Sequence, residues 1–407
     1  MNIKLLRFID KWAGLPLCFL FTITDKILSF FSFISSKDTD RRAPGKILFI
    51  GLAEMGSIVL AYPLIKKARD TYPEAEVFFL TFSRNNPVFG VLDMIPQRNV
   101  LSVREESVFL AVLDGLKALF RFRKEKIDTV FDLEFFSRST SVISYLTGAR
   151  RRIGFYGYNM DGLYRGGLLT HRIQYNPLLH VSRSFLSLWQ AAKSREKSSP
   201  DLEERISDEE TALPLISPPE DTERIKDRLN LSGITGEDRM ILVHPGEGSL
   251  SVREWPVENF IFLCRDILAD KRNYIVLIGN KGAREKADLI CGAVGGKRCL
   301  NLTDKTSLTE IFSLFYVSTA LVASDCGLVH LASLTPLKKF VLFGPESPKV
   351  FGPIDRNSRV IYSALPCSPC LSVFNRRRSS CRNAKCLKMI KPEYLSNLIK
   401  DSIRGQK

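Results

Sequence analysis

The 407-residue sequence predicts an α/β protein made of two Rossmann-like parallel-sheet domains that face each other across a cleft. Short apolar runs typical of strands alternate with longer stretches typical of helices, first over residues 46–135 and again over residues 240–344. Between the two series, residues 192–238 are polar and charged and contain prolines. Because continuous apolar strands that alternate with helices are typical of a parallel sheet covered on both faces, each series predicts a separate sheet.

These patterns divide the chain into four predicted parts. They are an N-terminal segment with a linker (residues 1–45), a first sheet domain (46–215), a second sheet domain (216–365), and a Cys-rich segment with a basic C-terminal helix (366–407). The length is sufficient for two to three domains, and the ordinary globular composition argues against an extensively disordered chain.

The charge is strongly positive, with a net value of +15. Residues 366–407 carry ten Lys or Arg against two acidic residues, and residues 1–45 carry seven against four. Such a balance indicates an anionic partner, which is a nucleic acid, an acidic lipid surface or a phosphorylated substrate.

The N-terminal segment predicts an amphipathic helix. No small-residue cleavage site follows the apolar run after Lys11, which argues against a removed signal peptide. Asp25 and Lys26 interrupt the run, which argues against a full membrane span. On a helix one side is polar: Cys18, Thr22, Asp25, Ser29, Ser32 and Ser36. The other side is apolar: Trp12, Leu15, Phe19, Ile23, Ile27, Phe30 and Ile34.

Two interpretations of this helix are open. It lies in the membrane interface as a monotopic anchor on the cytoplasmic side of the inner membrane, with its basic residues near anionic head groups, or it packs on the protein's own core. We favour the membrane, which makes an anionic membrane surface one predicted partner.

In the first domain, strands are predicted at residues 46–52, 76–82 and 128–135, with a crossover helix over residues 57–72. The loop after the first strand carries Glu54, Gly56 and Ser57. We expect Gly56 to allow a tight turn there.

In the second domain, strands are predicted at residues 240–246, 273–280, 299–302, 320–325 and 338–344. Ligands of such sheets bind beyond the carboxyl ends of the strands, so the loops that follow the strands supply the candidate site residues. These candidates are His244, Gly246, Arg253, Asn280, Asp325, Cys326, Gly327 and His330. Asp325, Cys326 and Gly327 begin a helix whose N–H groups are suited to holding a phosphate.

Each of these residues also has a simpler interpretation. Asp325 alone is equally typical of a helix N-cap, and His330 of a hydrogen-bonded core histidine. Arg253, beside Trp255, is equally typical of a surface residue packed on an aromatic ring.

Taken together and in order, the segments resemble glycosyltransferase family 9, the heptosyltransferase-like enzymes of bacterial envelope biosynthesis. The resemblance covers residues 46–390 and is carried by "KILFIGLAEMGSIVLAYPLIKKARDTYPEAEV", "GARRRIGF", "ILVHPGEGSLSVREWPVENF" and "SDCGLVHLAS". It implies a GT-B fold with an N-terminal acceptor domain, a C-terminal nucleotide-sugar domain, and inversion at the anomeric carbon without a catalytic metal. It further implies that Asp325, Cys326 and Gly327 hold the donor diphosphate and that Arg253 neutralises the leaving group.

The loop with Glu54 departs from the family pattern. The family usually has Gly-Asp where this chain has Gly56-Ser57, and that Asp is the base that deprotonates the acceptor hydroxyl. A serine is not basic near neutral pH without its own activator, so we expect Glu54 to be the base. The alternatives are that Glu54 is a solvated turn residue, that Asp132 or Glu134 is the base, or that the chain has none.

Four cysteines predict a structural metal site. Cys367, Cys370, Cys381 and Cys386 follow a C-x2-C-x10-C-x4-C spacing, and four thiolates can close a tetrahedral shell around zinc or iron. Free thiols or two disulfides are the alternatives. Such a site would hold the basic residues 376–378 near the cleft or the membrane. The other five cysteines are scattered, which favours a reducing compartment over a secreted disulfide framework.

The leading functional hypothesis is a membrane-associated transferase of a sugar, possibly heptose, from a nucleotide-diphosphate donor to a lipid-linked or lipopolysaccharide-core acceptor. A non-catalytic relative that binds nucleotide sugars is the alternative, motivated by Ser57 and Cys326. A metal-bearing nucleic-acid binder is disfavoured because no recognition-helix or RNP-type motif is present, so we expect no nucleic-acid partner.

Overall fold

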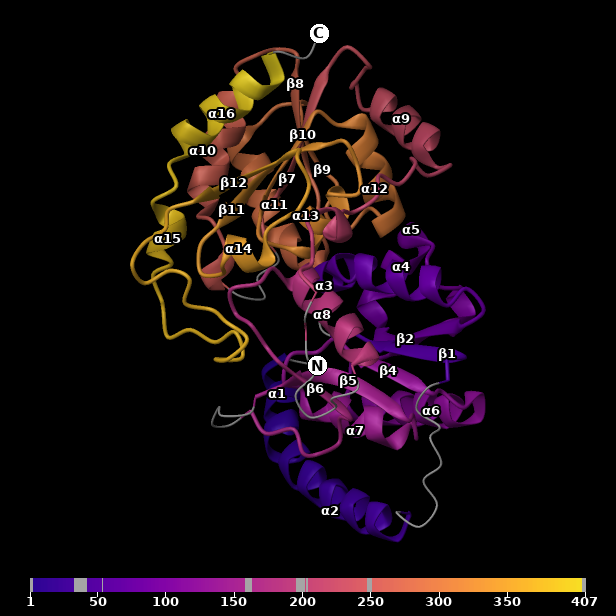
Figure 1. The fold of residues 1–407 in the computed structure, drawn as a ribbon. Coiled ribbons are helices and arrows are strands. Elements are labelled where there is room, and N and C mark those ends of the chain that lie inside the picture. The colour runs from indigo at the N-terminus through magenta and orange to yellow at the C-terminus, as the bar shows by residue number, and fades with distance from the viewer. Residues whose placement is uncertain are drawn as a thin grey trace. The chain divides into compact units, whose positions relative to one another are not determined.

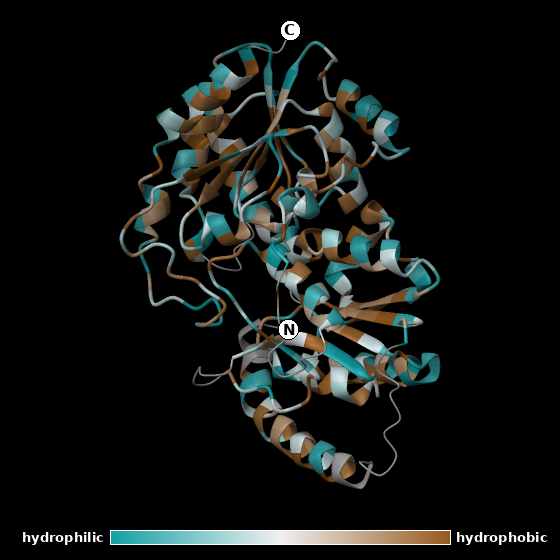
Figure 2. Ribbon diagram, in the orientation of Figure 1, coloured by the Kyte–Doolittle hydropathy of each residue, from teal (hydrophilic) through white to brown (hydrophobic). Residues whose placement is uncertain are grey.

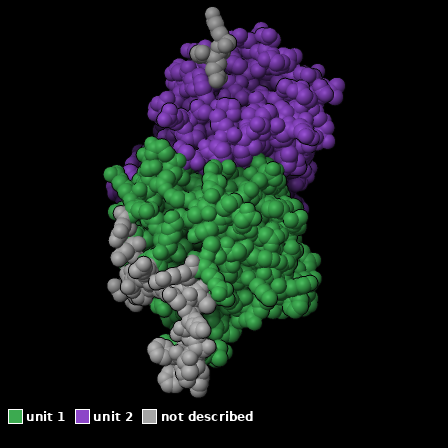
Figure 3. Space-filling model, turned by 45° about the vertical axis from the view of Figure 1, so that its right-hand side comes forward, with its two compact units in different colours: residues 1–211 green, residues 212–407 purple. Residues whose placement is uncertain are grey.

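The computed structural model describes residues 3–32, 42–52, 54–157, 163–194, 202, 204–246 and 251–404. The chain forms two compact units, residues 1–211 and residues 212–407, which are coloured separately in Figure 3. The boundary between the units falls inside the polar stretch over residues 192–238. That stretch also contains helix α9 (Thr222–Leu231), which buries Ile225 and Leu229.

Unit 1 is built on a six-stranded parallel sheet (Figure 1). In spatial order the strands are β3 (Val100–Val103), β2 (Glu76–Phe82), β1 (Lys46–Ile50), β4 (Thr129–Asp132), β5 (Arg151–Tyr156) and β6 (His171–Gln174). Its helices are α1 (Ile3–Trp12), α2 (Gly14–Ser32), α3 (Met55–Leu60), α4 (Tyr62–Thr71), α5 (Pro87–Leu92), α6 (Val108–Glu125), α7 (Arg138–Leu146) and α8 (Val181–Lys193).

The two faces of this sheet are covered by different helices because successive strand residues point to opposite sides. Leu48 and Ile50 of β1 share a core cluster with Phe122 of α6. On the other face, Phe49 stacks on Phe131 with ring centroids 5.2 Å apart, and Phe131 stacks on Trp189 of α8.

Unit 2 repeats this architecture. In spatial order its parallel strands are β12 (Ser358–Tyr362), β11 (Lys338–Phe343), β10 (Ala320–Ser324), β7 (Arg239–His244), β8 (Asn273–Leu277) and β9 (Cys299–Asn301). Besides α9, its helices are α10 (Val257–Ile267), α11 (Arg284–Val294), α12 (Leu308–Val317), α13 (Gly327–Ala332), α14 (Pro348–Phe351), α15 (Lys385–Lys388) and α16 (Pro392–Arg404). The basic C-terminal helix α16 belongs to this unit, since Leu395, Ile399 and Ile403 join its core cluster.

The predicted pair of Rossmann-like sheets is therefore confirmed, with differences in detail. The single crossover helix predicted over residues 57–72 is two helices, α3 and α4, that meet at Ala61. Pro63, in the first turn of α4, has no N–H to continue the α3 hydrogen bonds. The sheets also contain β3, β5, β6 and β12, which the apolar pattern did not predict. β3, β6 and β12 are edge strands and β5 begins with Arg151 and Arg152, so none of the four has the long apolar run of a central strand.

The N-terminal helix packs on unit 1 through its polar side. Cys18 is fully buried in a cluster with Val142 and Leu168. The Thr22 hydroxyl donates to the Cys18 carbonyl at 2.6 Å and accepts the Gly167 N–H at 2.8 Å. The side chains of Ser29, Phe30, Ser32, Ile34 and Ser36 lie outside those that the structure describes.

The apolar side of this helix remains exposed. Figure 2 shows hydrophobic residues over much of α2. Phe19 is 59% exposed and Ile27 51%, and Trp12, Leu15 and Ile23 are exposed as well. None of the helices in the described ranges combines the length and hydropathy needed to cross a membrane. The helix thus contacts its own domain, but with the polar side rather than the apolar one.

Candidate active site

In unit 1 the loop after β1 leads directly into α3. Glu54 is the N-cap residue of α3, in an extended conformation, and its carbonyl accepts the Ser57 N–H at 3.1 Å. The Glu54 and Ser57 side chains are both partly exposed. Gly56 is buried within the first turn of α3, so the expected tight turn at this glycine is wrong.

The end of the neighbouring strand β4 places two further carboxylates close to this loop. Asp132 is the register partner of Ile50 in β1, so the loops that follow these two strands are adjacent. Glu134, two residues beyond Asp132, accepts the Leu52 N–H at 2.7 Å and is partly exposed. Glu54 and Glu134 are therefore carried by adjoining loops at the carboxyl edge of the unit 1 sheet.

Asp132 itself is enclosed in the interior of unit 1. It is fully buried and forms an ion pair with Arg165, which is also fully buried. Arg165 donates further hydrogen bonds to the carbonyls of Ser137 at 2.8 Å and Phe155 at 2.9 Å. Burial raises the pKa of Asp132, and the Arg165 guanidinium opposes this shift. A carboxylate enclosed in this way holds the loops together and is not accessible to an acceptor hydroxyl.

In unit 2 the residues predicted for the donor site gather at the carboxyl ends of β7, β8 and β10. His244 ends β7 and is buried, with its Nδ1 atom 3.7 Å from the Cys326 sulfur. Gly279, which follows β8, has a φ of +147°, and a Cβ there would lie 3.2 Å from the His244 ring. The backbone conformation and the Ala283 Cβ, which would lie only 2.7 Å from an added Cβ, both favour glycine at this position.

Arg253 and Asp325 meet at the same edge. Arg253 ends the short 3-10 helix η4 (Ser251–Arg253), and Asp325 follows β10. They form an ion pair in which the side chains are 19% and 8% exposed. Trp255, in contrast, is buried and donates its indole N–H to the Ile390 carbonyl at 3.1 Å. Arg253 is therefore held by a carboxylate.

The start of α13 follows directly. Cys326, not Asp325, is the N-cap residue, and its side chain makes no capping hydrogen bond. The Asp325 carboxylate is accordingly engaged with Arg253 rather than with the helix N-terminus. Gly327, the first residue of α13, is partly exposed, and His330 is buried one turn further on.

The remaining two predicted donor residues have clear conformational roles. Gly246 has a φ of +96°, and a Cβ there would lie 3.2 Å from the Glu254 side chain. The residues that follow it, 247–250, lie outside the described ranges. Asn280 is exposed and caps the 3-10 helix η5 (Lys281–Ala283) by accepting the Gly282 N–H at 2.9 Å. Both positions shape the loops at this edge.

Sequence reasoning missed Glu346, which follows β11 at the same edge of the sheet. Its carboxylate is 1% exposed and lies 3.6 Å from the Arg377 guanidinium, which stacks 4.5 Å over the Phe351 ring. The sequence feature that could have identified Glu346 is its position in the loop "FGPESP", directly after a predicted strand. Arg377 belongs to the basic residues 376–378, so the Cys-rich segment reaches the loop after β11.

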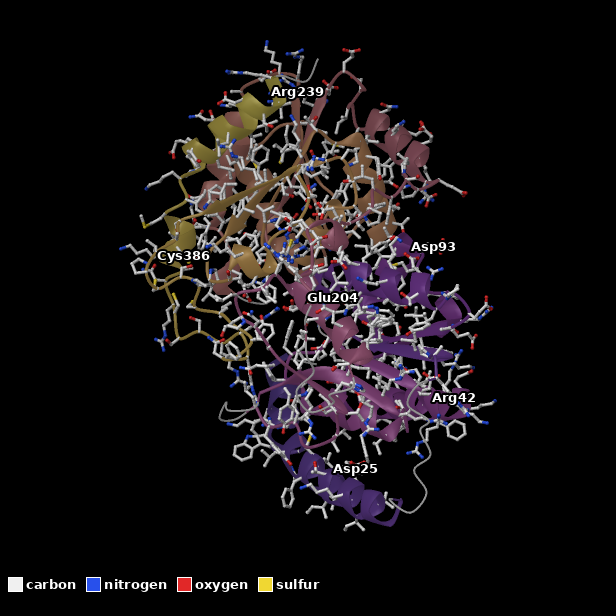
Figure 4. All side chains as sticks on the ribbon, viewed as in Figure 1. Asp25, Arg42, Asp93, Glu204, Arg239 and Cys386 are labelled. Carbon is white, nitrogen blue, oxygen red and sulfur yellow. The ribbon has the colours of Figure 1, made fainter. Side chains whose placement is uncertain are left out.

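This segment is fastened to the same loop by its backbone. The N–H groups of Cys370 and Leu371 both donate to the Pro345 carbonyl, at 2.9 and 2.8 Å. Cys386, labelled in Figure 4, is buried. Burial raises the pKa of its thiol, and the nearby Cys370 and Cys381 thiols raise it further. In the described part of the chain, however, no three His, Cys, Asp or Glu side chains are gathered closely enough to hold a metal ion.

Known proteins with similar sequences belong to one family of enzymes. Residues 117–379 match the model of glycosyltransferase family 9 (heptosyltransferase). Lipopolysaccharide heptosyltransferase 2 of Escherichia coli K12 is 23% identical over 319 residues, which cover 78% of this chain and 87% of that protein.

Two solved structures are similar over almost their whole length. The Escherichia coli ADP-heptose lipopolysaccharide heptosyltransferase II has a TM-score of 0.66 at 20% identity, with 88% of this chain and 98% of that chain covered. The glycosyltransferase family 9 protein of Veillonella parvula has a TM-score of 0.70 at 16% identity, with 90% and 99% covered.

The two doubly wound parallel sheets have the GT-B fold of the solved heptosyltransferase structures. The chain belongs to glycosyltransferase family 9, the heptosyltransferase family. The family, the fold class and the enzyme class predicted from the sequence are thereby confirmed.

Proposed function

We propose that this protein is an inverting heptosyltransferase. It transfers heptose from a nucleotide-diphosphate donor to a lipopolysaccharide-core acceptor. The observation that carries the proposal is the ion pair of Arg253 and Asp325 at the carboxyl edge of the unit 2 sheet. Support comes from relatives named lipopolysaccharide heptosyltransferase 2 and from an Escherichia coli heptosyltransferase solved with ADP and with ADP-2-deoxy-2-fluoro heptose, at a TM-score of 0.60.

The proposed reaction is a single displacement at the anomeric carbon. The acceptor oxygen forms a bond to that carbon while the bond from the carbon to the diphosphate oxygen breaks. The acceptor proton passes to the Glu54 carboxylate, and the bonding electrons leave with the diphosphate. Arg253, held by Asp325, stabilises the negative charge that develops on the leaving group.

The proposed donor site contains the carboxyl-edge residues of unit 2. His244, Gly246, Asn280, Asp325, Cys326, Gly327 and His330 are its members. Cys326 replaces a better hydrogen-bond donor to phosphate, and Ser57 occupies the position of the family's usual base. These two departures support the second candidate, a non-catalytic protein that binds nucleotide sugars.

We also propose that the enzyme attaches to the cytoplasmic face of the inner membrane through α1 and α2. The support is the exposed apolar side of α2, where Leu20 is 54% exposed and Leu28 63%. An amphipathic helix lies in an interface with its apolar side toward the acyl chains. Because the polar side packs on unit 1, the apolar side is the one presented to a membrane.

A structural zinc or iron ion at Cys367, Cys370, Cys381 and Cys386 is proposed as well. The spacing of the four cysteines supports it, as does the proximity of Cys370 and Cys381 to Cys386, whose pKa these two thiols raise. Binding would require these side chains to move closer together than the structure has them. The ion would order the segment that contacts Pro345 and Glu346 and would take no part in sugar transfer.

A donor panel tests the proposed function. The purified enzyme is incubated with ADP-heptose or other nucleotide sugars and with lipopolysaccharide that lacks outer heptose, and the product is analysed by mass spectrometry. We expect one added heptose with ADP-heptose. Donor binding by calorimetry without any transfer would support the non-catalytic candidate, and transfer of a different sugar would overturn the heptose assignment.

A further inference from the structure

A basic pocket of about 530 Å³ lies in unit 1, outside the carboxyl-edge loops described above. Its lining combines cationic side chains with small residues: Arg42, Ala43, Arg123, Lys126, Ile127, Asp128, Thr147, Gly148, Arg150 and Arg151. These residues come from the last turn of α6, from the turns that precede β1, β4 and β5, and from the first residue of β5. In a parallel sheet the amino ends of the strands share one edge, so this pocket opens at the edge opposite Glu54.

The pocket is lined by five cations that form no ion pair within the described part of the chain. Among the described residues, no carboxylate forms an ion pair with Arg42, Arg123, Lys126, Arg150 or Arg151. The one acidic lining residue is Asp128, whose carboxylate is occupied by the N–H groups of Gly45 at 2.7 Å and Lys46 at 3.0 Å. The pocket therefore carries a concentrated positive charge, which is suited to a phosphate group.

The backbone at Lys126 makes this residue suitable for testing the pocket charge. Lys126 is the C-cap residue of α6 and has a φ of +58°, in the left-handed region that favours glycine. Glycine adopts this conformation without strain, so replacing Lys126 by glycine removes the charge and keeps the turn.

An exposed apolar stripe on α6 leads to the pocket. Phe109, Val112, Leu116 and Phe120 are 55–75% exposed and lie three or four residues apart, so they share one side of the helix. The next residue on that side is Arg123, which lines the pocket. The opposite side of α6 packs on the sheet through Ala118 and Phe122. An apolar surface thus ends at a cationic pocket that is large enough to admit a phosphate group.

α6 is linked through α7 to the helix that carries the proposed membrane attachment. Arg123 of α6 donates to the Leu146 carbonyl of α7 at 2.7 Å, and α7 is the helix on which α2 packs. The two helices that carry the exposed stripes, α6 and α2, therefore both contact α7 within unit 1.

We propose that this pocket binds the phosphate head group of an anionic membrane lipid, with the acyl region along the α6 stripe. A soluble phosphate would account for the cations but not for the exposed aromatic and aliphatic residues that lead to them. The inference rests on the proposed attachment to the membrane, and it adds a specific lipid contact to the general contact made by α2.

Vesicle flotation tests the proposal with the full-length enzyme. Vesicles of phosphatidylcholine alone are compared with vesicles that also contain phosphatidylglycerol. Lys126→Gly removes one pocket charge without loss of fold, because glycine suits the backbone conformation there. We expect it to weaken binding to the anionic vesicles about fivefold and to leave binding to phosphatidylcholine unchanged. The control Lys124→Ala removes a charge from the same helix outside the pocket.

Three results would overturn the lipid assignment. One is equal weakening by Lys124→Ala and Lys126→Gly, which would indicate general surface electrostatics. Another is calorimetric binding of inorganic phosphate that depends on Lys126 while flotation does not depend on phosphatidylglycerol. The third is retained selectivity for phosphatidylglycerol in an Arg150→Ser/Lys126→Gly double variant.

Transfer to a soluble, deacylated core acceptor separates this proposal from the proposed function. Lys126→Gly should not change that rate, because the pocket lies outside the proposed catalytic residues. Lack of transfer in the unmodified enzyme would contradict the proposed function while leaving the vesicle result intact.

Discussion

Arg253 and Asp325, 72 positions apart in the chain, form an ion pair that is largely shielded from water at the carboxyl edge of the unit 2 sheet. The carboxylate fixes the orientation of the guanidinium, and the guanidinium compensates the buried carboxylate. A cation held in this way is already in place when negative charge develops on a leaving diphosphate, so no reorganisation is needed during the reaction.

The first prediction is that Arg253→Met lowers kcat by about 100- to 1000-fold, as loss of a transition-state contact does, with a smaller effect on donor Kd. Steady-state kinetics and calorimetry measure the two effects. Arg239→Met is the matched control, because Arg239 pairs with Asp270 at the amino end of β7 (Arg239 is labelled in Figure 4). A kcat close to that of the unmodified enzyme would exclude Arg253 from leaving-group stabilisation.

The second prediction concerns the base. Glu54→Gln should abolish transfer and retain nucleotide binding, because the amide cannot accept the acceptor proton. Glu134→Gln and Asp132→Asn are the comparison variants. We expect Asp132→Asn to lower the thermal unfolding temperature, since it leaves the buried Arg165 charge uncompensated. Turnover retained in Glu54→Gln and lost in Glu134→Gln would assign the base to Glu134.

The third prediction concerns the contact of α2 with unit 1. Gly166 has a φ of +72°, and a Cβ there would lie 2.7 Å from the Thr22 hydroxyl and 2.8 Å from the Cys18 carbonyl. Gly166→Ala should therefore displace α2 and expose Cys18. Gly233→Ala is the control, since Gly233 has a φ of +83° but open space around its Cβ position. Faster alkylation of Cys18, read by peptide mass spectrometry, is expected in the first variant alone.

The pH dependence of the same alkylation follows from the buried thiol. Burial raises the pKa of Cys18 from 9.0 to about 11. The stabilisation from a neutral, buried Cys18 is therefore fully present below pH 9 and is lost as the pH rises towards 11. Alkylation of Cys18 should remain slow up to about pH 9 and accelerate above it. A rate that follows the exposed Cys367 at every pH would contradict the observed burial.

The fourth prediction concerns the four clustered cysteines. We expect about one zinc or iron ion per chain by elemental analysis after purification under reducing conditions. Cys381→Ser should lose that ion, whereas Cys299→Ser, outside the segment, should retain it. Removal of the ion by a chelator should loosen the segment around Pro345, which hydrogen exchange would detect. Metal-free protein with unchanged exchange would contradict the proposed site.

Much of the fold could be predicted because strand and helix patterns depend on local chain properties. The runs around Ile47 and Val322 are apolar without interruption, which identifies buried parallel strands without tertiary information. Edge strands such as β12 were missed because an edge strand with exposed Arg359 and Val360 has no distinctive pattern. The unit boundary was predictable only within a broad polar stretch, because part of that stretch, α9, folds as a helix of unit 2.

The sequence by itself determined the two-sheet architecture, the order of the carboxyl-edge loops and the two-sided character of the N-terminal helix. These features depend on residue type and spacing along the chain. Only the tertiary structure decided that Asp325 pairs with Arg253, that Asp132 is enclosed by Arg165, and that the polar side of α2 faces the protein. Each of these contacts joins groups that are distant in the sequence. They form because a polar or charged group that is buried on folding needs a hydrogen-bond or ion-pair partner.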